Sequence, residues 1–208
     1  MDIGQLRGAE SARASRLLAR AFAEDPVITH FLYDPLRRLI AYPAFFRAVL
    51  EELLPCGHVY AARDRDDLIG VAAWKPADAP PPAPATRAVI ERQLRLIRLL
   101  FPRASQGLFQ GFAALEHVHP AHPHWYLAFV GIEPAIQSRG IGRALLAPVL
   151  ENADRTHALC YLETPFPRTH SFYERLGFTR HAEHSPFIGA PQGVVAFLRR
   201  PLTRGTAR

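Results

Sequence analysis

The sequence predicts an α/β fold, one domain in which a central sheet is flanked by helices, and three observations lead to this class. The 208 residues are 49% hydrophobic and 21% charged, which is typical of a globular chain, and this length suits a single domain spanning 1–208. Apolar strand-like runs at 125–132 and 157–164 alternate with helix-like segments at 140–154 and 168–176. The first of these runs, WYLAFVGI, is almost continuously apolar, so both faces of that strand should be buried.

The first 75 residues carry patterns for three strands and two helical regions. Leu17, Leu18 and Phe22 share one face at helical spacing, so a helix is expected over 9–25. It should end near Pro26, because the residue before a proline disfavours helix. The other expected elements are a strand at 2–6, a helical region at 35–55 that is either continuous or interrupted at Pro43, and strands at 58–64 and 67–75.

A proline-rich stretch, PADAPPPAPA, separates these elements from the second half of the chain. Its prolines favour an extended linker. The following segment at 86–101 is amphipathic and predicts a helix, and a second helix is expected at about 104–117. We therefore expect a helical insertion over about 78–124.

The C-terminal part continues the alternation of strands and helices. The short helix at 168–176 should end at Gly177, which stands where a left-handed cap forms. Two further strands are expected at 177–184 and 194–200, joined by a loop rich in proline and glycine. Residues 202–208 are expected to form a flexible tail.

Charge and cysteine content argue against several classes of function. The formal net charge is +6, but Lys75 is the only lysine and the arginines are scattered, so no nucleic-acid partner is expected. Cys56 and Cys160 are too few for a disulfide scaffold or a zinc site, and Cys160 is expected in the core. The N-terminus lacks the apolar segment of a signal peptide, and no apolar run reaches about 18 residues. We therefore expect a cytoplasmic protein with no membrane contact.

Four histidines lie close together in the stretch EHVHPAHPHW, at positions 117, 119, 122 and 124. Such a cluster is a candidate for metal binding. Its prolines break the helical spacing, however, and no H-E-x-x-H pattern occurs, so no metal site is expected. The stretch is interpreted as a loop that leads into the strand at 125–132. Whether one of these histidines lines a substrate pocket is left open.

The stretch IQSRGIGRALL places glycines and arginines where the apolar strand passes into a helix. The first four N–H groups of a helix have no partner within it, and with the helix dipole they form an anion site. Gly140 and Gly142 leave room for a phosphate, and Arg139 and Arg143 add positive charge. A tight turn without a ligand is the alternative. The stretch lacks the lysine of a P-loop and the third glycine of a dinucleotide fingerprint.

The order Gln137, Ser138, Arg139, Gly140, Ile141, Gly142 resembles the Q/R-x-x-G-x-G/A motif with which the GNAT superfamily of N-acetyltransferases binds the pyrophosphate of acetyl-CoA. The flanking segments VGIEP, GRALLAPVLENAD, YLET and SFYERLGF resemble further family motifs in the family's order. The resemblance is close over about 124–180, which is the expected acetyl-CoA-binding core, and loose elsewhere. Where the family often has an asparagine before its F-Y pair, this chain has Thr169 and His170.

The resemblance implies a GNAT fold. This is a central mixed, mostly antiparallel sheet of six to seven strands, splayed at the strand before the glycine turn and flanked by helices. Within the superfamily, the stretches LARAFAEDP, HPHWYLAFVGIEP and LETPFPRTHSFYERLGF resemble the branch that includes puromycin N-acetyltransferase. That finer resemblance does not identify the substrate.

The resemblance also implies acetyl-CoA as cosubstrate. Its pyrophosphate is expected on backbone N–H groups of the turn, and its pantetheine arm on strand backbone freed by a bulge near Phe129–Val130. Its thiol end is expected beside the segment that follows the fifth strand. The cofactor-binding residues expected on this basis are Phe129, Val130, Ile132, Gln137, Ser138, Arg139, Gly140, Ile141, Gly142, Arg143, His170 and Phe172.

Direct acetyl transfer from a thioester to an amine needs a base, an oxyanion donor and an acid for the departing thiolate. Tyr173 matches the tyrosine that serves as this acid in the family. Glu163 stands at the C-terminal end of a buried strand and is the expected base, acting directly or through a water, with Glu24 and Asp25 as alternatives. The backbone N–H of Val130 is the expected oxyanion donor.

The acceptor is expected to be the primary amine of a small molecule, held by the first two helices and the 78–124 insertion. The candidate aromatic wall residues are Phe22, Phe31, Tyr33, Phe45, Phe46, Trp74, Phe109, Phe112 and Trp125. The alternatives are an acyl-CoA-binding sensor without turnover, an acetyltransferase for protein or peptide amines, and a nucleotide-binding module. A monomer or a homodimer is expected.

Overall fold

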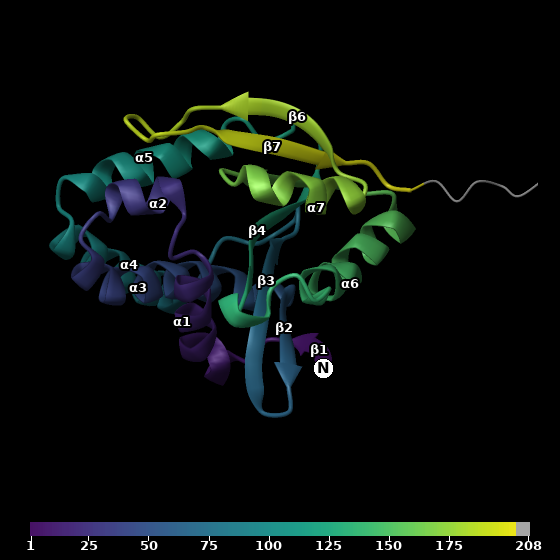
Figure 1. The fold of residues 1–208 in the computed structure, drawn as a ribbon, viewed down its shortest axis with the longest axis horizontal. Coiled ribbons are helices and arrows are strands. Elements are labelled where there is room, and N and C mark those ends of the chain that lie inside the picture. The colour runs from purple at the N-terminus through teal and green to yellow at the C-terminus, as the bar shows by residue number, and fades with distance from the viewer. Residues whose placement is uncertain (203–208) are drawn as a thin grey trace, which may run out of the picture.

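The computed structural model describes residues 1–202, which form a seven-stranded sheet with helices on both faces (Figure 1). The strand order is β1-β2-β3-β4-β5-β7-β6, and only the β4–β5 pair is parallel. The mixed, mostly antiparallel sheet expected from the resemblance is thus confirmed. The strands are β1 (Asp2–Gln5), β2 (Val59–Asp64), β3 (Asp67–Lys75), β4 (His124–Ile132), β5 (Leu159–Thr164), β6 (Thr179–His184) and β7 (Val194–Arg199).

Helices cover the two faces of the sheet unequally. In Figure 1, α1 to α5 gather on one side of the strands and α6 and α7 lie on the other. The helices are α1 (Ser11–Ala21), α2 (Pro26–Phe31), α3 (Pro35–Leu53), α4 (Pro84–Leu100), α5 (Ala104–Glu116), α6 (Ile141–Thr156) and α7 (His170–Arg175). Beyond Leu202, the tail expected at 202–208 lies outside the described residues.

The sheet separates two hydrophobic cores, and alternation along β3 shows how. Val71 and Ala73 pack into the core on the α1–α5 side, whereas Ala72 and Trp74 pack into the core formed with α6 and α7. Successive side chains of a strand point to opposite faces, so one strand serves both cores. The site described below lies at β4 and β5, in the middle of this sheet.

Strands β4 and β5 are paired only at their first residues. His124–Tyr126 face Leu159–Tyr161, after which the two strands separate while β5 continues its pairing with β7 as far as Thr164. The splay expected from the resemblance is therefore present. It also explains why most of β4 is only half-buried, although its apolar sequence predicted burial of both faces.

A β-bulge lies in β4 where the strand starts to separate from β5. Ala73 faces Phe129 and Trp74 faces Leu127, so Ala128 is the extra residue. The bulge is therefore one residue earlier than the predicted position at Phe129–Val130. A bulge increases local twist, which turns the second half of β4 away from its parallel neighbour.

The helices before the insertion differ from the prediction in one respect. Helix α1 ends at Ala21 rather than at residue 25, and the unexpected short helix α2 follows. It starts because the Asp25 carboxylate accepts hydrogen bonds from Val27 N and Ile28 N, both at 2.9 Å, with Pro26 in the first helical position. Helix α3 runs without a break through Pro43, which decides between the two alternatives.

Candidate active site

The turn between β4 and α6 presents a set of backbone N–H groups without partners in the helix. Gly140 caps α6 in the left-handed region, with a φ of +80°. Ala144 N donates the first hydrogen bond of the helix, to Gly140 O at 3.1 Å. The N–H groups of Ile141, Gly142 and Arg143 come before it in the chain and have no acceptor within the helix. These groups lie at the positive end of the helix dipole, an arrangement that suits an anion.

The same turn is tied to the strand before it and packed against α7. Gln137 Nε2 donates to Ile132 O, the last carbonyl of β4, at 3.2 Å. A Cβ atom added to Gly142 would stand 3.2 Å from the Phe172 ring, whereas a Cβ atom on Gly140 would meet nothing within 4 Å. Gly142 thus allows Phe172 to approach closely, and open space lies beside Gly140.

One cavity of about 690 Å³ extends from this turn to α2 and α5. Its walls include β4 beyond the bulge and the end of β5, so it follows the gap where the two strands separate. Most of the predicted site residues line it. They are Phe129, Val130, Ile132, Gln137, Ser138, Gly140, Gly142, Arg143, Glu163, Phe172 and Tyr173.

Three predicted cofactor-binding residues do not line the cavity. Arg139 is exposed, and the Ile141 side chain is buried in the core beneath α6, so that only its backbone faces the turn. His170 is buried at the start of α7, where its ring lies 5.2 Å from that of Phe197 and its Nδ1 is 2.7 Å from Arg180 Nη2. His170 is therefore not among the residues that line the cavity, and its place beside the thiol stays a prediction.

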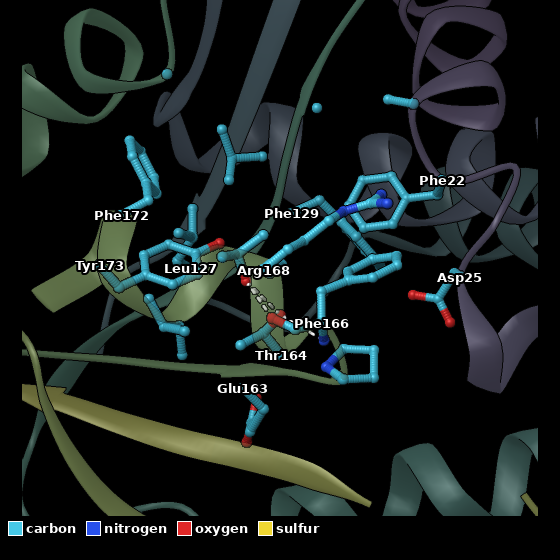
Figure 2. Close-up of a pocket in the computed structure, with 18 of the residues that line it drawn as sticks. Phe22, Asp25, Leu127, Phe129, Glu163, Thr164, Phe166, Arg168, Phe172 and Tyr173 are labelled. Carbon is cyan, nitrogen blue, oxygen red and sulfur yellow. Dashed lines mark hydrogen bonds between the residues drawn. The ribbon is translucent and has the colours of Figure 1, made fainter. Parts of the chain in front are cut away.

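Tyr173 enters the cavity from α7, and Figure 2 shows it beside Phe172 and Leu127. Its side chain packs against the rings of Phe172 and Phe178, with centroid distances of 5.1 and 6.0 Å. Burial raises the pKa of the Tyr173 hydroxyl, so this group is protonated at neutral pH and can donate a proton or a hydrogen bond.

Glu163 lies at the wall of the same cavity, on the face of β5 that points toward α1–α5. Its side chain is only 4% exposed, and its Oε1 lies 3.2 Å from His119 Nε2 without the alignment of a regular hydrogen bond. Figure 2 shows Glu163 near Thr164 and apart from Tyr173. Sequence reasoning identified Glu163 but missed its partner, because a contact between a loop and a strand 44 residues later has no local pattern.

A second carboxylate, that of Asp25, faces the cavity from the turn between α1 and α2 (Figure 2). Asp25 is 4% exposed, and burial raises the pKa of its carboxyl to about 6, against the lowering effect of the two N–H groups that it caps. One of its oxygens makes both capping hydrogen bonds. The other is thus available to a ligand.

Aromatic side chains form much of the wall on the α2 and α5 side. Of the nine aromatic residues predicted there, Phe22 and Phe112 line the cavity. Trp74 is instead fully buried in the core on the α6 side, and Tyr33 is exposed. The wall is completed by aromatic residues that the sequence did not single out for the acceptor, namely Tyr126, Phe129, Phe166 and Phe187.

The described part of the chain has neither a cluster of metal ligands nor a helix suited to a membrane. Within residues 1–202, no three His, Cys, Asp or Glu side chains are grouped so that they could hold a metal ion. No helix in the same range is both long and apolar enough to cross a membrane.

The chain is similar to known proteins both in its fold and in its sequence. A Corynebacterium glutamicum structure, described as histone acetyltransferase HPA2 and related acetyltransferase, is 23% identical, with a TM-score of 0.72 over 98% of this chain and 97% of that one. Drosophila melanogaster polyamine N-acetyltransferase is 16% identical, with a TM-score of 0.64 over 96% and 99%. At these identities the two structures show the shared fold. The model of the acetyltransferase (GNAT) family matches residues 28–178, more than half of the sequence, and the chain therefore belongs to the GNAT family of acetyltransferases.

Proposed function

We propose that this protein transfers an acetyl group from acetyl-CoA directly to the primary amine of a small molecule. The observation that carries the proposal is one continuous cavity that runs from the unpaired amides at the start of α6 to the carboxylates Glu163 and Asp25. Two substrates that enter such a cavity from its two ends meet in the gap between β4 and β5.

The residues of the first half of this cavity fit coenzyme A. The N–H groups of Ile141, Gly142 and Arg143 suit a pyrophosphate, and the open space beside Gly140 leaves room for it. The separated edges of β4 and β5 offer backbone groups to the amides of the pantetheine arm, and Phe172 then flanks the thiol end. Arg139 contributes at most its backbone and its charge, since its side chain is exposed.

The chemistry follows from the groups on the two sides of the gap. Glu163 takes the proton of the bound ammonium, directly or through a water, so that the amine becomes a nucleophile. The amine then attacks the thioester carbon, and the N–H of Val130 stabilises the oxyanion. Tyr173, which burial keeps protonated, gives its proton to the thiolate as the C–S bond breaks. The second proton that the nitrogen loses as the amide forms then restores the phenol of Tyr173.

The second half of the cavity favours a cationic amine with an apolar body. Phe22, Phe112 and Phe187 offer apolar surface, while Asp25 and Glu163 offer negative charge to an ammonium group. The resemblance to the branch that includes puromycin N-acetyltransferase stays a prediction that fits this lining. Protein or peptide amines remain the alternative acceptors.

A thiol-release assay with acetyl-CoA and a panel of amines tests the proposal. The panel should include puromycin-like nucleosides, diamines, arylalkylamines and short peptides. We expect turnover with at least one small amine and little with the peptides. Tight binding of acetyl-CoA without turnover on any amine would favour the sensor alternative, and stabilisation by ATP or NAD in place of CoA would favour a nucleotide-binding module.

The variant Tyr173→Phe tests the acid. We expect its kcat to fall by about 100-fold or more, because general acid catalysis commonly contributes a factor of about 10² to 10⁴. Its Kd for acetyl-CoA, measured by calorimetry, should stay within about twofold of the wild-type value. Equal losses of turnover and affinity, or no loss at all, would contradict the assigned role. Phe178→Leu serves as a control for the aromatic packing around Tyr173.

A further inference from the structure

Three titratable side chains, those of Glu163, His119 and His124, lie in a row that begins at the cavity wall. His119 Nε2 lies 3.2 Å from Glu163 Oε1, and His119 Nδ1 lies 3.2 Å from His124 Nε2. His124 Nδ1 in turn lies 2.8 Å from the backbone oxygen of His122. The row therefore leads from a buried carboxylate at the cavity through two imidazole rings to the loop before β4.

The last contact determines where the ring protons lie. A carbonyl oxygen only accepts, so His124 Nδ1 must carry the hydrogen that it donates to His122 O. Burial lowers the pKa of His124, so at neutral pH its ring holds one proton and its Nε2 presents a lone pair. His119 Nδ1 must then be the donor between the two rings. The lone pair of a neutral His119 consequently lies on Nε2, the atom that faces Glu163.

We propose that His119 is a positioning residue that acts through Glu163: it receives the proton that Glu163 has removed from the acceptor amine, and His124 holds its ring in the receiving tautomer. This inference rests on the proposed function, because it needs Glu163 as the base.

The proton transfers balance without any further reactant. An N–H bond of the bound ammonium breaks and an O–H bond forms on Glu163; this O–H bond then breaks and an N–H bond forms at His119 Nε2. The groups before the step are an ammonium, a carboxylate and a neutral imidazole. The groups after it are a neutral amine, a carboxylate and an imidazolium, so the total charge is unchanged. The restored carboxylate stabilises the adjacent imidazolium.

Neighbouring aromatic rings hold His119 in place and do not take up the proton that passes from Glu163 to His119. The rings of Tyr126 on β4 and Tyr161 on β5 lie on the His119 ring, with centroid distances of 4.5 and 4.8 Å. Burial, aided by the nearby charge of Glu163, raises the pKa of both phenols, so they stay protonated and do not take up the proton. Glu116, at the end of α5, is the further carboxylate that acts on Tyr126.

The pH dependence of kcat/KM tests the inference, with an amine that the wild-type protein acetylates. The variants are His119→Gln, His124→Gln and, as a matched control from the same loop, His117→Gln, whose side chain is exposed and outside the cavity. Glutamine retains a hydrogen-bond donor but cannot take up a proton. For His119→Gln we expect kcat/KM to fall about 100-fold with an unchanged Kd for acetyl-CoA.

The low-pH limb of the profile separates a relay from a merely structural role. If the relay operates, this limb in the wild-type protein follows protonation of an imidazole as well as of a carboxylate. In His119→Gln only the carboxylate is left to take up a proton, so the limb should move to lower pH. His124→Gln should give a smaller loss of about tenfold, and His117→Gln should match the wild type. A loss of equal size at every pH, with the limb unmoved, would overturn the proposal.

A second measurement does not depend on turnover. Side-chain ¹⁵N NMR spectra should show neutral His119 protonated on Nδ1, and the second proton should bind at Nε2. In Glu163→Gln this uptake should shift to lower pH, because the carboxylate no longer stabilises the imidazolium. A neutral His119 protonated on Nε2 would overturn the relay.

The two proposals fail in different ways. Full activity of Glu163→Gln would overturn both the assignment of the base and the relay that depends on it. A strong loss in Glu163→Gln together with wild-type behaviour of His119→Gln would overturn the relay alone and leave the proposed function in place.

Discussion

Asp25 combines two tasks that make opposite demands on one side chain. Its carboxylate caps α2, which favours the charged form, and its burial at the cavity wall favours the neutral form and raises its pKa to about 6. The carboxyl of an unfolded chain titrates near 4. Between these two pH values the folded protein keeps a proton that the unfolded chain has lost. The free energy of unfolding should therefore fall as the pH rises from about 4 to about 6, and stay at its lower value above that.

The variant Asp25→Asn should remove this dependence, which amounts to about 3 kcal/mol at a pKa shift of this size. Asparagine caps helices as well as aspartate does, so the variant should be at least as stable as the wild type at pH 7. If Asp25 also binds the ammonium group, the KM for the amine should rise while kcat changes little. Denaturant unfolding at pH 4, 5, 6 and 7 and steady-state kinetics measure the two effects.

A matched control is Asp34→Asn, since Asp34 caps α3 with the same pair of hydrogen bonds but is more exposed. It should leave both the pH dependence and the KM for the amine unchanged. A large fall of kcat in Asp25→Asn, with an unchanged KM, would indicate instead that Asp25 is the base.

At the scale of single elements, the entrance to α6 depends on backbone rather than side chains. Gly140→Ala places a side chain at a φ of +80°, which costs about 1–2 kcal/mol, and adds a methyl group to the space beside the unpaired amides. Gly142→Val brings its side chain against Phe172. Both variants should raise the Kd for acetyl-CoA about tenfold or more, whereas Arg143→Ala, which keeps its N–H, should raise it less.

Calorimetric titration with acetyl-CoA measures these affinities. Gly8→Ala is the control, since a Cβ atom there meets nothing within 4 Å and its φ is not in the left-handed region. A larger effect of Arg143→Ala than of Gly142→Val would mean that side-chain charge, not backbone geometry, binds the pyrophosphate.

A buried ion pair between Arg199 and Asp154 connects β7 to α6. The Arg199 guanidinium is 3% exposed, and it donates to both oxygens of Asp154, at 2.8 and 2.7 Å, and to Leu176 O at 2.9 Å. Asp154→Ala leaves this buried cation without its carboxylate and should lower the free energy of unfolding by about 3 kcal/mol. Pairing with Arg199 lowers the pKa of Asp154, so the stabilisation is present at neutral pH and is lost in strong acid.

Urea unfolding of Asp154→Ala beside Glu151→Ala, an exposed carboxylate on the same helix, measures this contribution. The control should lose less than about 0.5 kcal/mol. Similar losses in the two variants would show that the ion pair contributes nothing beyond a surface charge.

At the scale of the whole molecule, the sequence predicted the order of strands and helices well because each leaves a local pattern. The apolar run of β4, the glycines before α6 and the amphipathic stripe of α4 were all visible in short windows. Helix α2 was missed because six residues are too few to show a helical period. The bulge was misplaced by one residue, since the apolar run of β4 contains no marker for its position.

The candidate site was predictable where it follows motifs, and not where it depends on contacts between distant segments. The glycine turn, Phe172, Tyr173 and Glu163 all line the cavity. His170, which the motif also suggested, does not line the cavity and instead contacts Arg180 of β6 and Phe197 of β7, a packing that has no local pattern in the sequence. The contact of His119 with Glu163 and the burial of Asp25 likewise arise from packing between elements.

Strands β4 and β5 are paired over only three residues each, and this short pairing has a consequence for hydrogen exchange. In an antiparallel ladder alternate residues direct both N–H and C=O to the same neighbour, so every second residue of β4 beyond Tyr126 turns these groups away from β3 and toward the gap. In the free protein their amide hydrogens should exchange with deuterated water within seconds, while those that face β3 stay protected. Addition of coenzyme A should slow only the fast set, leaving a pattern with a period of two along one strand.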